Sequence, residues 1–176
     1  MSTIKANTWK NSNGVVHKTV IQVETKVIND IASYSSPVGS QTIIDPLSIT
    51  ITPIYASSKI IVKWMINGEL HQDNVFRIYK NGILAPNGQN PTVTGRWVGY
   101  ASGFYDRDES TTPSNWNITY IDSPNTTNPT VYQLAVGISS GTAYTFYLNR
   151  TVSGSTTGQD FYERGVSVAT ATEIIQ

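Results

Sequence analysis

The chain of 176 residues contains no cysteine. Disulfide bonds, thiolate metal sites and cysteine nucleophiles are therefore excluded. The opening residues, MSTIKANTWKNSNG, also lack the apolar segment of a secretory signal. Both absences are typical of a protein made in a reducing cytosol, and they leave its later location open.

Charge is also scarce, because Lys, Arg, Asp and Glu make up 14% of the residues and their charges sum to zero. Globular proteins usually contain about a quarter charged residues. No run of Lys and Arg is present, so a nucleic-acid partner is not expected. Apolar runs are short and interrupted every few residues, so membrane insertion is not expected either.

The stretch from Leu47 to Gly68, LSITITPIYASSKIIVKWMING, has the clearest strand pattern in the chain. Apolar residues first alternate with Ser and Thr, and after Pro53 a second run begins at Ile60. This second run has a fully apolar side and a mixed side. The apolar side is Ile60, Val62, Trp64 and Ile66, and the mixed side is Ile61, Lys63 and Met65. We predict a core hairpin whose apolar side fills the interior and whose mixed side meets a neighbouring subunit.

No stretch of the chain carries a convincing helical stripe. Residues 15–29 are predicted to be extended because β-branched residues are dense there, although a helix is the alternative. Asn81-Gly82 is a strong two-residue hairpin signal, and residues 131–138 and 143–149 are predicted to form a further hairpin. The sequence therefore predicts an all-β fold, an antiparallel β-sandwich or jelly roll of about 8 to 10 strands.

The predicted organisation is a polar N-terminal leader at residues 1–14 and one β-sandwich domain at residues 15–176. Trp9 is unusual in so polar a leader and is a candidate attachment residue. Such a residue docks either on its own domain or on a neighbouring chain. Several predicted strands carry apolar residues on both faces, which favours a closed cyclic oligomer.

Several short motifs, taken in their order, resemble bacteriophage virion proteins. They are the opening MSTIKANTW, the SITITP and ASSKIIV between Leu47 and Val62, Asp122-Ser123-Pro124, Val131-Tyr132-Gln133-Leu134, Leu148-Asn149-Arg150-Thr151, and a closing strand near Glu173-Ile174. Together they resemble tail-fibre and virion structural proteins of marine and cyanobacterial phages. The region from Gly82 to Thr119 shows no such motif, and in a host-binding protein variable loops are expected there.

This resemblance implies a jelly-roll-like head similar to tumour-necrosis-factor and complement-C1q heads. It implies a homotrimer that contacts other virion proteins, and it implies no active site. The protein would be made in the host cytoplasm, carried in the virion and released by lysis, which agrees with the missing secretory signal.

Aromatic residues surround an acidic segment between residues 97 and 116. The candidate glycan-binding or interface residues are Trp97, Tyr100, Phe104, Tyr105, Asp106, Asp108 and Trp116. Sugar rings stack on aromatic side chains, and nearby Asp or Asn side chains bind the hydroxyls. The alternative is that the aromatics belong to the core or to a trimer interface, because aromatics dominate both. Alternation leaves at most one face, Trp97 with Tyr105 or Tyr100 with Phe104, free for a ligand.

Metal and cofactor sites are not expected. The acidic run 106–109 lacks the spacing of a calcium-binding loop and is predicted to be solvated. His17 and His71 each lack a partner at metal-ligand spacing.

The sequence thus predicts a non-enzymatic phage structural protein, in the first place a trimeric tail-fibre or fibre-tip protein that binds host-surface polysaccharide. One alternative is a capsid decoration or head-fibre protein. Another is a carbohydrate-active hydrolase, which would need two placed carboxylates such as Asp106 with Glu109 or Asp160 with Glu163.

Overall fold

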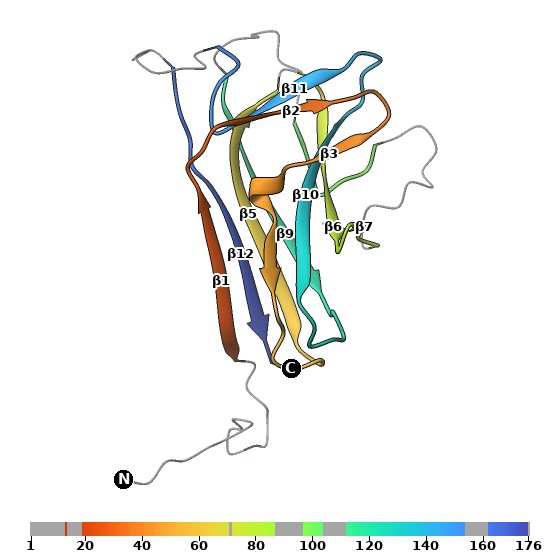
Figure 1. Cartoon of the computed structure of the whole chain (residues 1–176), viewed down its shortest axis with the longest axis vertical. Coiled ribbons are helices and arrows are strands. Elements are labelled where there is room, and N and C mark those ends of the chain that lie inside the picture. The colour runs from red at the N-terminus through yellow and green to blue at the C-terminus, as the bar shows by residue number, and fades with distance from the viewer. Residues whose placement is uncertain are drawn as a thin grey trace.

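The computed structural model describes residue 13 and residues 19–70, 72–86, 97–103, 112–153 and 162–175. These residues form twelve β-strands and one short 3-10 helix, so the all-β prediction is confirmed (Figure 1). The elements are β1 (Val20–Ile28), β2 (Ala32–Ser36), β3 (Gln41–Ile43), η1 (Asp45–Leu47), β4 (Ile49–Ile51), β5 (Lys59–Glu69), β6 (Asn74–Lys80), β7 (Ile83–Leu84), β8 (Ala101–Gly103), β9 (Ser114–Asp122), β10 (Thr130–Ile138), β11 (Tyr144–Leu148) and β12 (Ser167–Ile174). The described part of the chain has no helix with the length and apolar character needed to span a bilayer.

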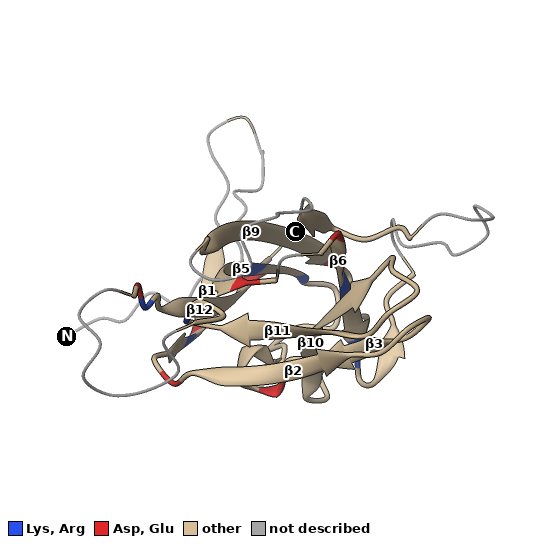
Figure 2. Cartoon of the chain, turned by 90° about the horizontal axis from the view of Figure 1, so that it is seen from above, with Lys and Arg blue, Asp and Glu red and all other residues tan. Residues whose placement is uncertain are grey.

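The strands form two six-stranded antiparallel sheets that pack as a β-sandwich, consistent with a jelly roll. Sheet I contains β1, β12, β5, β11 and β2 in that order, with β9 paired to β5. Sheet II contains β3, β10, β6 and β7, with β4 on β10 and β8 on β6. Seen from above, β9, β5, β12 and β1 lie on one side of the molecule, and β10 and β3 lie on the other (Figure 2).

Two predicted hairpins are wrong, although all four of their arms are strands. β4 belongs to sheet II and β5 to sheet I, so the stretch from Leu47 to Gly68 crosses the sandwich. β10 and β11 also belong to different sheets. An alternating pattern shows which side of a strand faces the core. The pattern is the same for two strands that pair within one sheet and for two strands that face each other across the sandwich. A short loop also spans the roughly 10 Å between stacked sheets.

The predicted sides of β5 are confirmed. The side that carries Trp64 is fully buried, whereas Lys63 and Met65 are exposed. The indole Nε1 of Trp64 donates a hydrogen bond of 2.8 Å to the carbonyl of Leu47, so the buried ring also has its polar atom satisfied. Residues 20–28 form strand β1, as predicted, and the helical alternative is wrong.

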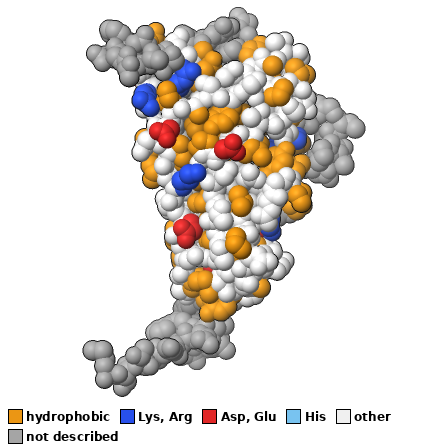
Figure 3. Space-filling view, viewed as in Figure 1, with side chains coloured by type: hydrophobic (Ala, Val, Ile, Leu, Met, Phe, Trp, Pro, Cys, Tyr) orange, Lys and Arg blue, Asp and Glu red, His pale blue; other side chains and the backbone are white. Residues whose placement is uncertain are grey.

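β1 carries charged side chains along one of its sides. Glu24 and Lys26 alternate with Val23, Thr25 and Val27. Acidic and basic side chains follow one another along this strand, on the left of the space-filling view (Figure 3). This side of β1 lies toward η1 and β4, where it contacts the edge of the second sheet.

The predicted Asn81-Gly82 turn is confirmed. β6 and β7 pair on either side of it, and the two residues have φ angles of 50° and 78°. Two successive positive φ angles are characteristic of a type I′ hairpin turn. The Asn81 side chain accepts a hydrogen bond of 2.8 Å from the N–H of Val131, which ties the turn to β10.

Replacing Gly82 by Ala is expected to lower the free energy of unfolding by about 1 kcal/mol, because a Cβ disfavours positive φ. No atom lies within 4 Å of the position that this Cβ would take, so the loss would come from the backbone alone. Gly141→Ala is the control, because Gly141 has equal space and no positive φ. Urea denaturation measures both variants, and equal losses would contradict the prediction.

Two buried glutamates hold loops at opposite ends of sheet I. Glu173 on β12 accepts hydrogen bonds from the backbone N–H groups of Ile54 (2.9 Å) and Tyr55 (3.1 Å). Glu69 on β5 accepts hydrogen bonds from the N–H groups of Val152 (2.6 Å) and Thr112 (3.2 Å). Hydrogen bonds from several backbone N–H groups replace the water that a carboxylate loses on burial. Glu173 therefore fixes the loop that connects β4 of sheet II to β5 of sheet I, and Glu69 holds the segments before β9 and after β11.

Candidate functional site

A groove of about 440 Å³ opens at the end of sheet II where β6 begins and β10 ends. Its lining combines an aromatic ring with a carboxylate, an amide and hydroxyl groups. The lining residues are Asp73, Asn74, Val75, Trp97, Ser102, Gly103 and Ser139. The groove lies at the end of the sandwich opposite to the paired residues Val20 and Ile174 of β1 and β12 (Figure 1).

Trp97 forms one wall of this groove and is held against the outer face of sheet II. The guanidinium carbon of Arg77 lies 4.8 Å from the centre of the indole, which is a cation–π geometry. The Nε of Arg77 also donates a hydrogen bond of 2.7 Å to the carbonyl of Val98, so the backbone beside the ring is fixed. Gly137 on β10 leaves room for the ring, because a Cβ there would lie 2.9 Å from Cζ3 of Trp97. The ring position is therefore set by residues that are far apart in the sequence.

Asn74 fixes the strand that borders the groove. Its side-chain oxygen accepts a hydrogen bond of 3.1 Å from the N–H of Gly103 on β8. Its side-chain nitrogen donates a bond of 3.3 Å to the carbonyl of Gln72. Asn74 is buried and serves the framework, whereas Asp73, Ser102 and Ser139 are exposed and offer their polar groups to a ligand.

The predicted candidate aromatics have different positions. Trp97 is half-buried and lines the groove. Trp116 is 8% exposed and packs against the ring of Phe76, so it belongs to the core and its ring is closed to a ligand. Tyr100 packs edge-on against the ring of Tyr120, and burial raises the pKa of Tyr100. Of the three, Trp97 alone has the position that glycan binding needs.

The other candidates lie outside the described residues. They are Trp9, Phe104, Tyr105, Asp106 and Asp108, together with Glu109, Asp160, His17 and His71. Glu163, which belongs to one of the carboxylate pairs of the hydrolase alternative, is described and exposed.

The sequence pattern did not single out Asp73, Ser102 or Ser139. They become neighbours because β6 pairs with both β8 and β10, which places the start of β6 beside Ser102 and the end of β10. Short polar residues next to strand ends are common in turns, so nothing in the sequence separates Asp73 and Ser139 from other turn residues. The pairing register of the sheet brings these three residues together, and it is known only from the structure.

The lining of the groove is aromatic and polar. Asp73 is the single carboxylate in its described lining, whereas most glycosidases use two. Elsewhere in the described ranges, no three His, Cys, Asp or Glu side chains gather in a metal-binding arrangement. An aromatic wall with a few placed polar groups is the usual make-up of a small-molecule site. The arrangement suits a ligand with hydroxyl groups and apolar C–H faces.

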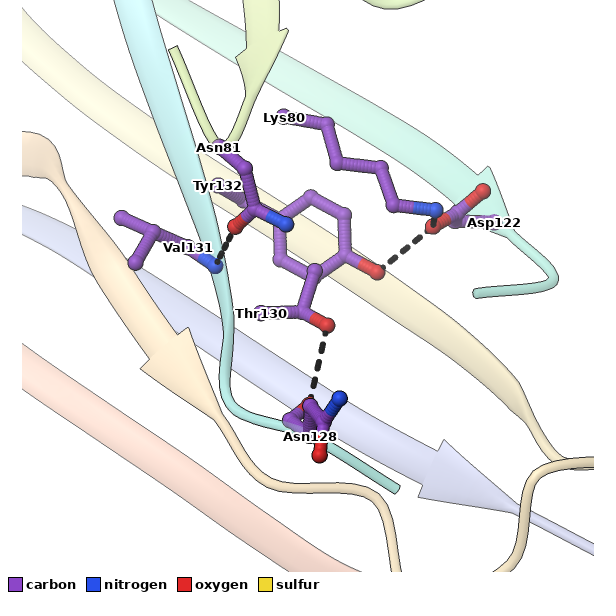
Figure 4. A network of polar contacts seen from close by, with 7 residues as sticks. All are labelled: Lys80, Asn81, Asp122, Asn128, Thr130, Val131 and Tyr132. Carbon is purple, nitrogen blue, oxygen red and sulfur yellow. Dashed lines mark hydrogen bonds and ion pairs between the residues drawn. The ribbon is translucent and has the colours of Figure 1, made fainter. Parts of the chain in front are cut away.

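A second polar cluster joins the two sheets at the other end of the sandwich (Figure 4). Asp122, the last residue of β9, accepts a hydrogen bond of 2.8 Å from the hydroxyl of Tyr132 on β10. The same oxygen lies 2.6 Å from Nζ of Lys80 at the end of β6. Burial raises the pKa of Tyr132, and the hydrogen bond to Asp122 raises it further, so the phenol remains a donor. Because Asp122 is buried and engaged by both partners, this cluster acts as a tie between the sheets.

Comparison with known proteins does not assign the chain to a family: no family model matches it, and no curated protein matches it. A β-sandwich by itself hosts many unrelated functions. The groove and the residues that line it are therefore the features of this chain from which a function can be inferred.

Proposed function

We propose that the chain is the head of a trimeric bacteriophage fibre and that the groove beside Trp97 binds a glycan of the host surface. The observation that carries the proposal is one groove in which the Trp97 ring lies beside the exposed polar groups of Asp73, Ser102 and Ser139. Sugars have apolar C–H faces that stack on an aromatic ring and hydroxyls that hydrogen-bond to such groups. The resemblance to phage virion proteins supplies the biological setting.

The size and place of the groove support the same proposal. Its volume of about 440 Å³ falls within the range of ordinary ligand pockets, about 300 to 1,000 Å³. The groove lies at the end of the sandwich away from the start of β1 (Figure 1). A head attached to a particle through the β1 end would therefore present the groove outward.

Binding would be multivalent. A single shallow groove with one aromatic wall gives weak affinity. Three such grooves on one rigid head act together, since the second and third binding events are intramolecular. Tight attachment to a cell then needs no strong individual site.

We expect Trp97→Ala to weaken binding to host lipopolysaccharide or capsular polysaccharide by about tenfold or more, because the stacking surface is lost. Asp73→Asn keeps the shape of the side chain and removes its charge, and we expect a smaller loss of about threefold. Isothermal titration calorimetry with polysaccharide extracted from the host measures both variants.

The matched control is Tyr55→Ala, because Tyr55 is an exposed aromatic residue in the loop between β4 and β5, at the opposite end of the sandwich. Its binding should equal that of the native protein. Native affinity in Trp97→Ala would contradict the proposed site. A native protein that binds no host glycan and occurs in many copies on the capsid would instead be a decoration protein.

A further inference from the structure

We propose that copies of this chain associate through the outer face of sheet I. This face consists of three rows of side chains across β1, β12, β5 and β9. The rows are Val23, Thr172, Ile61 and Ile121; Thr25, Thr170, Lys63 and Thr119; and Val27, Val168, Met65 and Asn117. This inference rests on the trimer of the proposed function and names its contact surface.

The first argument is the reversed polarity of β1. Glu24 and Lys26 lie directly opposite two buried alanines of β12, so they are on the core side of the sheet. Val23 and Val27 lie on the solvent side and are 53% and 57% exposed. A sheet with one solvated face normally shows the opposite arrangement, with polar side chains outward. β1 is thus built for a covered outer face.

The second argument is that the apolar character continues across the sheet. Met65 on β5 and Ile121 on β9 are 37% and 53% exposed. Between β5, β9 and β12 lies a shallow groove of about 200 Å³. Lys63 is the single charged side chain within the three rows. Depletion of charge around exposed apolar side chains distinguishes the centre of a protein interface from ordinary surface.

The occupant that fits this face is a second copy of the chain. A face with one charged side chain is a poor binding surface for a strongly acidic or basic partner, because such a partner needs charges of the opposite sign. Four strands about 4.8 Å apart and about nine residues long cover roughly 19 by 30 Å, on the order of 600 Å². Stable interfaces bury about 600 to 1,000 Å² on each partner, so the face reaches the lower end of this range.

In a closed ring of copies the contact is heterologous, so two different patches meet. The β1 side of the face, with Val27, would contact the β5 and β9 side of the next copy, with Met65 and Ile121. Changing either side alone should therefore break every contact in the ring.

The test uses Val27→Lys and Met65→Lys as separate variants of the full chain. Light scattering coupled to size exclusion should give the mass of a trimer for the native protein and that of a monomer for each variant. Circular dichroism should be unchanged, because both side chains are already exposed. Ile83→Lys is the control, because Ile83 is 73% exposed on β7 in the other sheet and its variant should remain a trimer.

Three results would overturn the inference: a native protein that is monomeric at micromolar concentration, a trimer in either Val27→Lys or Met65→Lys, or dissociation by Ile83→Lys. The groove is tested separately. Monomeric Val27→Lys should bind a short glycan fragment with native affinity per chain and should lose binding to whole cells. Trp97→Ala should lose the fragment and remain a trimer. Failure of the interface and failure of the glycan site therefore give different results.

Discussion

The free energy of unfolding is expected to fall by about 4 kcal/mol when Asn149 is replaced by Asp. The fully buried amide of Asn149 donates hydrogen bonds to the carbonyls of Ile28 (2.8 Å) and Asp30 (2.9 Å). Its oxygen accepts a hydrogen bond of 2.6 Å from the hydroxyl of Ser167. A carboxylate of the same shape has no hydrogen to donate, so two carbonyl oxygens would face negative charge in the interior.

The backbone does not account for this expected loss. Asn149 has a φ of 59°, and Asp tolerates that region as Asn does. The matched control is Asn125→Asp, because Asn125 has a φ of 54° and is exposed. Its stability should change by less than about 0.5 kcal/mol. Urea denaturation at neutral pH compares the two variants, and similar losses would show that the buried hydrogen bonds of Asn149 contribute little.

A loss of about 3 kcal/mol is expected for Glu173→Leu, because it leaves three partly buried hydrogen-bond donors without their acceptor. The carboxylate is fully buried and accepts bonds from the N–H groups of Ile54 and Tyr55 and from the side-chain amide of Gln22 (2.7 Å). The loop between β4 and β5 would lose its attachment to β12. Glu24→Leu is the control, since Glu24 is an exposed glutamate on the neighbouring strand. Equal effects at the two glutamates would contradict the role given to Glu173.

The same carboxylate should make stability depend on acid. Desolvation raises the pKa of Glu173, but hydrogen bonds from Ile54, Tyr55 and Gln22 hold that pKa below its ordinary value. A glutamate whose pKa is lower in the folded state stabilises the protein above its unfolded pKa of about 4.3. This contribution is lost as the pH falls through the unfolded value and then the folded value. Urea denaturation between neutral and acidic pH should therefore show a smaller acid-induced loss for Glu173→Gln than for the native protein, and an unchanged acid dependence would refute this.

The strands and their buried sides were largely predictable, because burial leaves a period-2 pattern in the sequence. Trp64 and its apolar neighbours on β5 are an example. The sheet to which each strand belongs was not predictable in the same way. β4 and β5, like β10 and β11, bury one side each, and that pattern is identical for paired strands and for strands that face each other. The alternating pattern does not show which neighbouring strand each strand is hydrogen-bonded to.

The candidate site was predictable in part. The density of aromatics pointed to the region of Trp97, which lines the groove. Trp116 alternates with exposed asparagines on β9, and this period-2 pattern, like that of Trp64, already indicates a buried side chain. Asp73 and Ser139 enter the groove through the register of β6 and β10, which no local pattern encodes.

The motifs that resemble phage proteins have a structural explanation. They contain Asp122 and Tyr132, which tie the two sheets together, and Asn149 and Glu173, which hold loops through buried hydrogen bonds. These are framework residues, and none of them lines the groove. A resemblance carried by such residues describes the scaffold.

The position of β12 between β1 and β5 has a consequence for biosynthesis. β1 is made first and β12 last, yet the two strands pair along nearly their whole length. On the ribosome, sheet I must therefore remain open between β1 and β5 until β12 has emerged. Pairing between strands so distant in sequence is slow, and unpaired edges favour aggregation in the meantime. The nascent chain thus depends on β12 to cover the facing edges of β1 and β5.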